Sequence, residues 1–165
     1  MNIDLSQKNN NMKKLLTTVI FIMLGVSTYS LYAQNKTIKG KVIDDNLSAL
    51  PYVSIAFNDS IEVGKTDLNG LFQISIPATV KKISFKTVGI ELADIELADK
   101  CDEVEVVMML RCTCDFMAPK KADRLRMKRF KKLSQLHKEA FEKGIFKTDK
   151  ACYTQEFIPY YSKVQ

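Results

Sequence analysis

The 165-residue chain contains one histidine, no tryptophan and six scattered glycines, and these scarcities exclude several kinds of site. A zinc peptidase site needs several histidine and carboxylate ligands. A serine or cysteine nucleophile needs a histidine base that is held by an orienting group. The one histidine, His137, lies in a basic stretch far along the chain from any obvious nucleophile. Because no glycine-rich loop that could hold a phosphate is present either, the sequence predicts no enzyme, no metal and no cofactor.

Long apolar runs are also scarce, and the one of nearly membrane-spanning length lies near the N-terminus. Lys13 and Lys14 precede the run LLTTVIFIMLGV, and the polar stretch after it ends in LYAQ. A basic start, an apolar segment and a small residue before the cut are typical of a secretory signal. We therefore expect residues 1–33 to be a signal peptide that is cleaved after Ala33, and the alternative is an uncleaved anchor. The expected location is the periplasm or the cell envelope.

The four cysteines stand at positions 101, 112, 114 and 152. An even number of cysteines in an exported protein permits disulfides. One residue separates Cys112 from Cys114, so we expect no bridge between them, and a bridge from Cys112 or Cys114 to Cys152 would tie down the C-terminal segment. Free, buried thiols are the alternative. Metal binding is disfavoured because the usual zinc spacing leaves about two to four residues between the cysteines.

Apolar and polar residues alternate between residues 36 and 110, as they do in half-buried strands. Seven such runs are TIKGKVID, PYVSIAF, SIEVGKT, LFQISIP, KKISFKTV, GIELADIEL and EVEVVMML. Short strands with turn residues between them predict an all-β sandwich with one core. The sixth run changes phase, which predicts a β-bulge near Ala93 and Asp94. The residues expected on the inner faces are Ile38, Gly40, Val42, Val53, Ile55, Phe57, Phe72, Ile74, Ile76, Ile83, Phe85, Ile90, Leu92, Ile95, Leu97, Val104, Val106, Met108 and Leu110.

The stretch TDLNG, between the third and fourth runs, fits either a cation-binding loop or a tight turn. Asp67 at the first position and Gly70 at the fourth are typical of a type I turn. Asp67 can accept backbone N–H bonds there, and Gly70 can take a positive φ. A calcium site needs about 6–8 oxygen ligands, whereas Leu68 and Leu71 flank this loop. We therefore interpret Asp67, Asn69 and Gly70 as a structural turn.

The same region resembles the carboxypeptidase regulatory-like (peptidase-associated) domain over residues 36–110. The matching residues are Gly40, Val42, Asp44, Leu50, Pro51, Gly64, Thr66, Asp67, Gly70 and Phe72, followed by FKTVGI. The resemblance implies a transthyretin-like, immunoglobulin-like sandwich that is non-catalytic and exported, as is common in Bacteroidota-type bacteria. Such domains accompany outer-membrane transporters and cell-surface proteins. The family often has glycine where Tyr52 stands, so we expect that turn to differ here in tightness or exposure.

The C-terminal part of the chain is basic. Residues 34–110 hold 8 Lys and Arg against 12 Asp and Glu, whereas residues 111–165 hold 14 against 6. Apolar residues then recur at helical spacing, which predicts a basic amphipathic helix over residues 119–144. The apolar stripe is formed by Leu125, Phe130, Leu133, Leu136 or His137, Ala140 and Phe141. Packing of this stripe on the sandwich is the favoured interpretation, an anionic membrane surface is the second, and nucleic acid is disfavoured because the chain is expected to be exported.

The tail, residues 145–165, is rich in aromatic side chains, and such tails seldom stay free in water. We expect it to dock on this chain or on a partner. The sequence thus predicts a non-catalytic, exported β-sandwich module that binds an envelope or outer-membrane protein. The alternative is a membrane-surface protein held by its basic helix or by an uncleaved N-terminal segment, and a third, weaker hypothesis is a hydrolase that uses His137. The candidate partner or membrane contacts are Arg124, Lys128, Lys131, Lys132, Phe157, Tyr160 and Tyr161.

Overall fold

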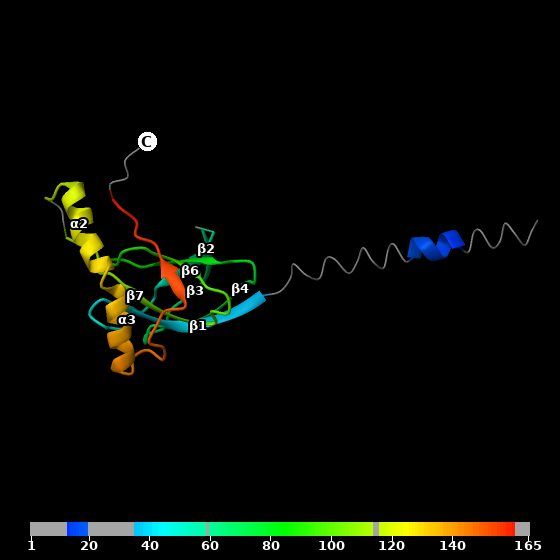
Figure 1. Ribbon diagram of the computed structural model, residues 1–165, viewed down its shortest axis with the longest axis horizontal. Helices are drawn as coiled ribbons and strands as arrows, with labels where there is room; N and C mark the ends of the chain where they lie inside the picture. Colours follow the sequence, from blue (N-terminus) through cyan, green and yellow to red (C-terminus); the bar gives the residue numbers. More distant parts are fainter. Residues whose placement is uncertain (1–12, 20–34, 59, 114–115, 161–165) are drawn as a thin grey trace, which may run out of the picture. The chain divides into compact units, whose positions relative to one another are not determined.

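The computed structural model describes residues 13–19, 35–58, 60–113 and 116–160 (Figure 1). The chain divides into two compact units, Met1–Asn35 and Lys36–Gln165. In the first unit residues 13–19 are helical, and the expected cleavage site after Ala33 lies outside the described residues. Among the described helices, none has the length and apolar character that crossing a bilayer requires.

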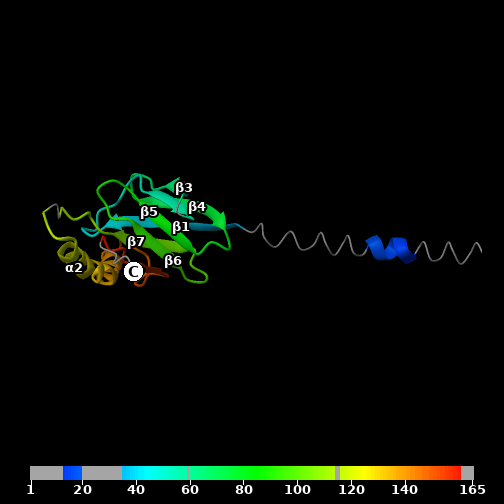
Figure 2. The ribbon, with the colours of Figure 1, turned by 90° about the horizontal axis from the view of Figure 1, so that it is seen from above.

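The second unit is mostly β, and its described residues form two sheets with eight strands in all (Figures 1 and 2). The three-stranded sheet has the order β4-β1-β7, and the five-stranded sheet has the order β3-β2-β5-β6-β8. β1 and β7 are parallel, whereas all neighbouring strands of the five-stranded sheet are antiparallel. The strands are β1 (Asn35–Asp44), β2 (Ser54–Phe57), β3 (Ile61–Lys65), β4 (Leu71–Pro77), β5 (Lys82–Lys86), β6 (Ala93–Leu97), β7 (Glu103–Met108) and β8 (Tyr153–Gln155).

Each of the seven predicted runs contains one strand, so the predicted order of strands is confirmed. The predicted bulge near Ala93 and Asp94 is wrong, because both residues pair regularly with β5. The change of phase arises where β6 begins. Glu91, just before the strand, is buried, whereas Leu92 is exposed, contrary to the prediction for its side chain. The register shift that does occur lies between Ile55 and Ala56 of β2.

The main core lies between the two sheets and consists largely of the predicted inward-facing residues. It contains Ile38, Val42, Val53, Ile55, Phe72, Ile74, Ile76, Ile83, Phe85, Ala93, Ile95, Leu97, Cys101, Val104, Val106 and Met108. Phe72 and Phe85 meet edge to face across it, with ring centroids 5.6 Å apart. Gly40 is needed in β1 because a Cβ there would lie 1.7 Å from the carbonyl oxygen of Val104 in β7. The two neighbouring strands can therefore approach only if this residue has no side chain.

Expectations from the sequence concern two turns, one at residues 67–70 and one at Tyr52. The Asp67 carboxylate accepts hydrogen bonds from the backbone N–H groups of Asn69 (2.9 Å) and Leu71 (2.8 Å), and Gly70 has a φ of +74°, as in the predicted turn. Tyr52, where the resembling family often has glycine, has a φ of +55° and is 64% exposed. A tyrosine in this left-handed region is uncommon and costs conformational energy.

The basic segment is helical as predicted but forms two helices, α2 (Pro119–Phe130) and α3 (Leu133–Glu142), with a turn at Lys131 and Lys132 between them. α3 packs on the outer face of the three-stranded sheet, beside β7 (Figure 1). This contact makes a second apolar cluster of Ile43, Val107, Met109, Leu133, Ala140 and Phe146. β1 and β7 are therefore covered on both faces, which explains the continuous apolar run VVMM, which ends β7 and continues one residue beyond it.

The predicted apolar stripe holds in part for both helices. Leu133, His137 and Ala140 of α3 are buried, and Phe130 of α2 packs against the outer cluster. Leu125 of α2 is 37% exposed, and Phe141 of α3 is 41% exposed. The buried residues of α2 are Ala122 and Arg126. An arginine, not a leucine, therefore faces the sandwich from this helix.

Candidate functional site: the docked C-terminal segment

The tail supplies β8, the strand that lies beside β6 at one edge of the five-stranded sheet. β8 pairs antiparallel with β6, with Leu97 opposite Tyr153 and Ile95 opposite Gln155. The Ala98 N–H donates to the carbonyl oxygen of Cys152 (2.9 Å), and the Glu156 N–H donates to that of Asp94 (3.0 Å), so the pairing extends beyond both ends of β8. The expected docking of the tail thus takes place on this chain, through main-chain hydrogen bonds.

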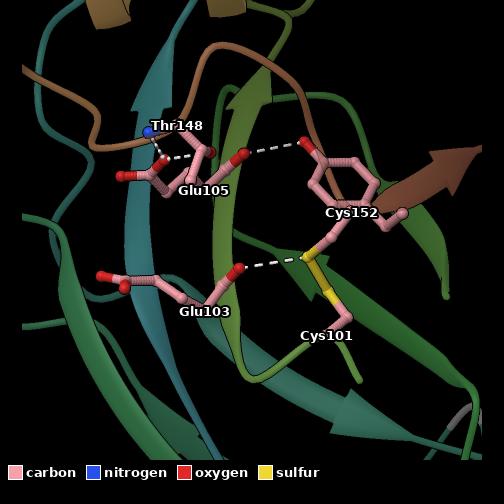
Figure 3. Close-up of a disulfide and its surroundings, with 6 residues drawn as sticks. Cys101, Glu103, Glu105, Thr148 and Cys152 are labelled. Carbon is pink, nitrogen blue, oxygen red and sulfur yellow. Dashed lines mark hydrogen bonds between the residues drawn. A yellow bond between two sulfur atoms is a disulfide. The ribbon is translucent and has the colours of Figure 1, made fainter. Parts of the chain in front are cut away.

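A disulfide between Cys101 and Cys152, which are 51 residues apart in sequence, fixes this strand (Figure 3). The prediction that Cys112 or Cys114 bridges to Cys152 is therefore wrong. The β6–β8 pairing places Cys152 opposite Ala98, three residues before Cys101, whereas Cys112 follows the other end of β7. Cys112 is also disulfide-bonded, and Cys114 lies outside the described residues.

A buried carboxylate on β7 holds the segment between α3 and β8. Glu105 accepts hydrogen bonds from the N–H groups of Lys147 (2.7 Å) and Thr148 (3.1 Å) and from the Thr148 hydroxyl (2.8 Å). The Tyr153 hydroxyl donates to the Glu105 carbonyl oxygen (2.9 Å), and burial raises the pKa of this phenol above its ordinary value (Figure 3). Main-chain donors in a loop and a carboxylate in the sheet thus satisfy each other, which makes the burial of Glu105 tolerable.

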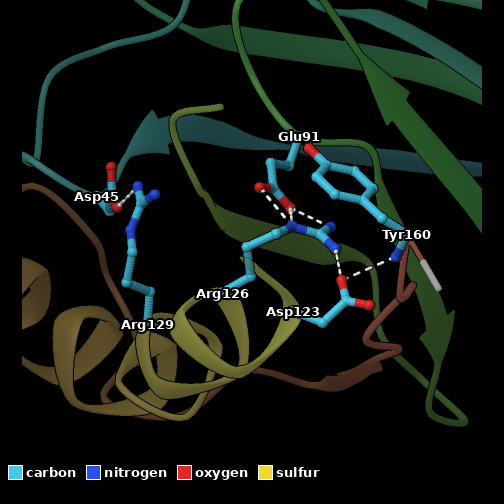
Figure 4. Close-up of polar contacts among 6 residues, drawn as sticks. All are labelled: Asp45, Glu91, Asp123, Arg126, Arg129 and Tyr160. Carbon is cyan, nitrogen blue, oxygen red and sulfur yellow. Dashed lines mark hydrogen bonds and ion pairs between the residues drawn. The ribbon is translucent and has the colours of Figure 1, made fainter. Parts of the chain in front are cut away.

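Arg126 of α2 lies at the centre of a second group of contacts (Figure 4). Its Nε donates to both carboxylate oxygens of Glu91, at 2.8 and 2.9 Å, and its Nη1 donates to Asp123 at 2.8 Å. Burial alone would lower the pKa of Arg126, but the hydrogen bonds and attraction to Glu91 raise it above its ordinary value. Arg126 therefore keeps its positive charge inside the protein.

The tail covers this ion pair with aromatic rings. The guanidinium carbon of Arg126 lies 3.6 Å from the ring centroid of Tyr160 and 5.1 Å from that of Phe157. Phe157 also packs against Phe130, with ring centroids 5.4 Å apart. The Tyr160 N–H donates to Asp123 at 2.8 Å. Phe157 and Tyr160, two of the candidate partner contacts, thus contact this chain, and Tyr161 lies outside the described residues.

The remaining candidate contacts are on the surface. Arg124, Lys128, Lys131 and Lys132 are all exposed. These residues were predicted from the sequence and Arg126 was not, although Arg126 stands four residues after Ala122 and four before Phe130 and so shares their helical face. That spacing was the signal that could have found it. Arg129, on the neighbouring turn, pairs with Asp45 of the β1–β2 loop.

His137 lies on the buried face of α3 and makes no hydrogen bond through either ring nitrogen within the described residues. Its ring centroid lies 4.8 Å from that of Phe146. Burial lowers the pKa of His137, although the Glu105 carboxylate and nearby backbone groups act in the opposite direction. The hydrolase hypothesis requires a hydrogen bond between this histidine and a nucleophile, and the described part of the chain contains none.

Comparisons with known proteins add no relative: no family model matches the chain, and no curated protein or solved structure matches it. Within the described residues, no cluster of three or more His, Cys, Asp or Glu side chains could hold a metal ion.

Proposed function

We propose that this chain is a non-catalytic, exported β-sandwich module of the carboxypeptidase regulatory-like type, with a transthyretin-like and immunoglobulin-like fold. We propose further that it binds a protein of the cell envelope by accepting a strand at the edge of β3. The observation that carries the proposal is the contrast between the two edges of the five-stranded sheet. The chain completes one edge with its own β8, and no described strand continues the sheet beyond β3 at the other.

The pairing of β8 with β6 supports this mode of binding because it is itself the addition of a short extended segment to an edge of the same sheet. Three residues of an otherwise irregular tail pair with β6 through backbone hydrogen bonds. Such strand addition takes its affinity from the main chain and its specificity from alternate side chains. β3 offers five residues of extended backbone, and Ile61 at its start is 49% exposed. An extended partner segment with an apolar residue beside Ile61 would fit this edge.

The hydrogen bonds of the buried acids support a structural role for the interior of the module and not a role as a reactive centre. The buried acids Asp44, Glu91 and Glu105 each accept hydrogen bonds from groups of this chain that close a turn, anchor a helix or hold a loop. Groups used in this way stabilise one arrangement of the chain. The surface, and the β3 edge in particular, is then where a partner would bind.

The test is site-specific photo-crosslinking in the native host, with the crosslinking residue at Ile61 or Glu62 of β3. The matched control is Gln73, an exposed strand residue of the other sheet. We expect one discrete envelope protein to be crosslinked from β3 and not from Gln73. An Ile61→Lys substitution, which places a charge on the edge, should weaken the crosslink from Glu62. Equal crosslinking from β3 and Gln73, or none from either, would contradict the proposal.

A membrane-surface role is the second candidate, and the exposure of Arg124, Lys128, Lys131 and Lys132 supports it. Attachment through these cations should weaken as salt screens them. The test is flotation of the full chain with phosphatidylglycerol vesicles, with an Arg124→Gln/Lys128→Gln variant for comparison. Salt-sensitive flotation that the variant loses would favour this role over binding at β3.

A further inference from the structure

A pocket of about 280 Å³ lies between α3, β7 and the docked tail. Its apolar walls come from each of these parts: Phe130 and Leu133 from the helical segment, Val107 from β7, and Ala151 and Tyr153 from the tail. Lys131, Ser134, His137 and Gln155 complete the lining. The pocket exists only because the tail returns to the sandwich, and none of the functions considered above uses it.

The walls of this pocket are fixed before any ligand arrives. Val107 and Leu133 belong to the buried outer cluster. The Tyr153 hydroxyl is already hydrogen-bonded to the Glu105 carbonyl oxygen, so the tyrosine presents its ring to the pocket from a fixed position. The tail wall is held by β8 pairing and by the Cys101–Cys152 disulfide. A preformed pocket lowers the conformational entropy that a ligand must overcome on binding.

Among the described residues, the lining of the pocket contains no acidic residue; Glu105 and Asp149 act on His137 from outside the lining. Lys131 is the charged residue in the lining, it is exposed, and no ion pair is found at it in the part of the chain that the structure describes. The first turn of α3, which borders the pocket, carries no acidic residue. Burial lowers the pKa of His137, so this side chain is neutral at pH 7 and adds no second charge. An anionic group at the mouth would therefore meet a cation and no opposing carboxylate from the lining.

We propose that this pocket binds a small amphipathic carboxylate, with an aliphatic or aromatic body against Val107, Leu133 and Tyr153 and the carboxylate toward Lys131. The size agrees: an apolar cavity of about 150 Å³ is enough for benzene, and pockets for small molecules begin at about 300 Å³. A two-chain lipid would need far more space. The ligand is therefore a free acid and not the headgroup or chains of a bilayer lipid, and this site is independent of the β3 edge.

The experiment is a titration of the full, disulfide-bonded chain with octanoate, followed by amide chemical shifts in two-dimensional NMR spectra. We expect saturable shifts centred on Val107, Leu133 and Tyr153, with a dissociation constant on the order of millimolar. Octanamide, the neutral analogue, should bind more weakly. Lys131→Gln should raise the dissociation constant for octanoate roughly two- to five-fold.

The chain supplies a matched control, because Lys132 is the next residue, is also exposed and does not line the pocket. Lys132→Gln should leave the dissociation constant unchanged. Ala151→Trp, at an exposed position of the wall, should fill the pocket and abolish the shifts while the spectrum of β2 to β5 stays as in the wild type. Phosphatidylglycerol vesicles should not displace octanoate.

Four results would overturn the proposal. They are the absence of saturable shifts at the pocket, equal binding of octanoate and octanamide, equal effects of Lys131→Gln and Lys132→Gln, and retention of binding in a folded Ala151→Trp variant. Displacement of octanoate by the vesicles would assign the pocket to membrane lipid and would overturn the choice of a free acid.

Discussion

Arg126 is the charged side chain that α2 buries against the sandwich. Replacing it with alanine would leave the buried Glu91 carboxylate without its cation, at a cost of about 3–5 kcal/mol in the free energy of unfolding. Urea denaturation measures this cost. Lys128→Ala, on the exposed face of the same helix, should change stability by less than about 0.5 kcal/mol.

Removing both charges distinguishes the electrostatic contribution of the ion pair to stability from the contribution of the volume that its side chains fill. A Glu91→Leu/Arg126→Met variant leaves no unpaired buried charge, so it should be more stable than Arg126→Ala alone. Equal losses in Arg126→Ala and Lys128→Ala would contradict the role that the contacts in Figure 4 give to Arg126.

Tyr52 is a residue whose side chain conflicts with its backbone conformation. Its φ of +55° lies in the left-handed region, which costs an L-residue other than glycine about 1–2 kcal/mol. Tyr52→Gly should therefore be neutral or stabilising when measured by urea denaturation. Lys39→Gly, at an exposed position inside β1, should instead destabilise by about 0.5–1 kcal/mol. A loss of stability in Tyr52→Gly as large as that in Lys39→Gly would mean that the tyrosine side chain makes a contact that outweighs the strain.

His137 should make stability depend on pH, and the sign follows from its burial. Because burial lowers its pKa in the folded state, the unfolded chain binds a proton at a higher pH, near the ordinary value of about 6.5. Protonation then favours unfolding, so stability should fall as the pH drops below about 6.5.

The variant that isolates this effect is His137→Leu, because His137 is the one histidine of the chain. The urea midpoint of the wild type should decrease between pH 7.5 and pH 5, and that of His137→Leu should change less over the same range. Parallel curves for the two proteins would show that other groups cause the dependence.

At the scale of the elements, β8 is the strand that depends most on a covalent bond. It has three residues, and the disulfide that holds it closes a segment with a sequence separation of 51. Loss of such a cross-link is expected to cost up to about 4 kcal/mol, chiefly through the entropy of the unfolded chain. A Cys101→Ser/Cys152→Ser variant tests this cost and leaves the bond at Cys112 in place.

Hydrogen exchange then locates the effect. Amides of β6 and β8 should exchange faster in the variant, whereas those of β2 and β5 should stay protected. Unchanged protection of β6 would mean that the backbone pairing holds the tail without the disulfide.

The sequence predicted elements best where one face of a strand is buried and the other is not. β4 shows this, since Phe72, Ile74 and Ile76 alternate with exposed residues. Prediction from the sequence failed where a contact is polar or joins residues that are far apart along the chain. α2 is anchored by an arginine, which apolar periodicity does not count, and the partner of Cys152 depends on which sheet edge the tail reaches. The pocket was not predicted for the same reason, because its walls come from segments that meet only through tertiary packing.

At the scale of the whole molecule, the folded unit extends well beyond residues 36–110, the range over which the sequence predicts the sandwich. α3 covers Ile43, Val107 and Met109 on the outer face of the three-stranded sheet. Glu91 and Glu105, inside that range, find their partners in residues after 119. We therefore expect the sandwich and the C-terminal segment, which form one compact unit, to unfold cooperatively.

Truncation after Ala118 tests this cooperation. It would expose the apolar outer face, open the β6 edge and leave two carboxylates without their partners, and large exposed apolar patches cause association. We expect the truncated chain to aggregate on size-exclusion chromatography and to bind a hydrophobic dye. Adding Ile43→Thr, Val107→Thr and Met109→Gln should reduce the aggregation without restoring the free energy of unfolding, because the buried acids still lack partners. A truncated chain that is monomeric and as stable as the full chain would instead make residues 36–118 an independent domain and the C-terminal segment a mere appendage.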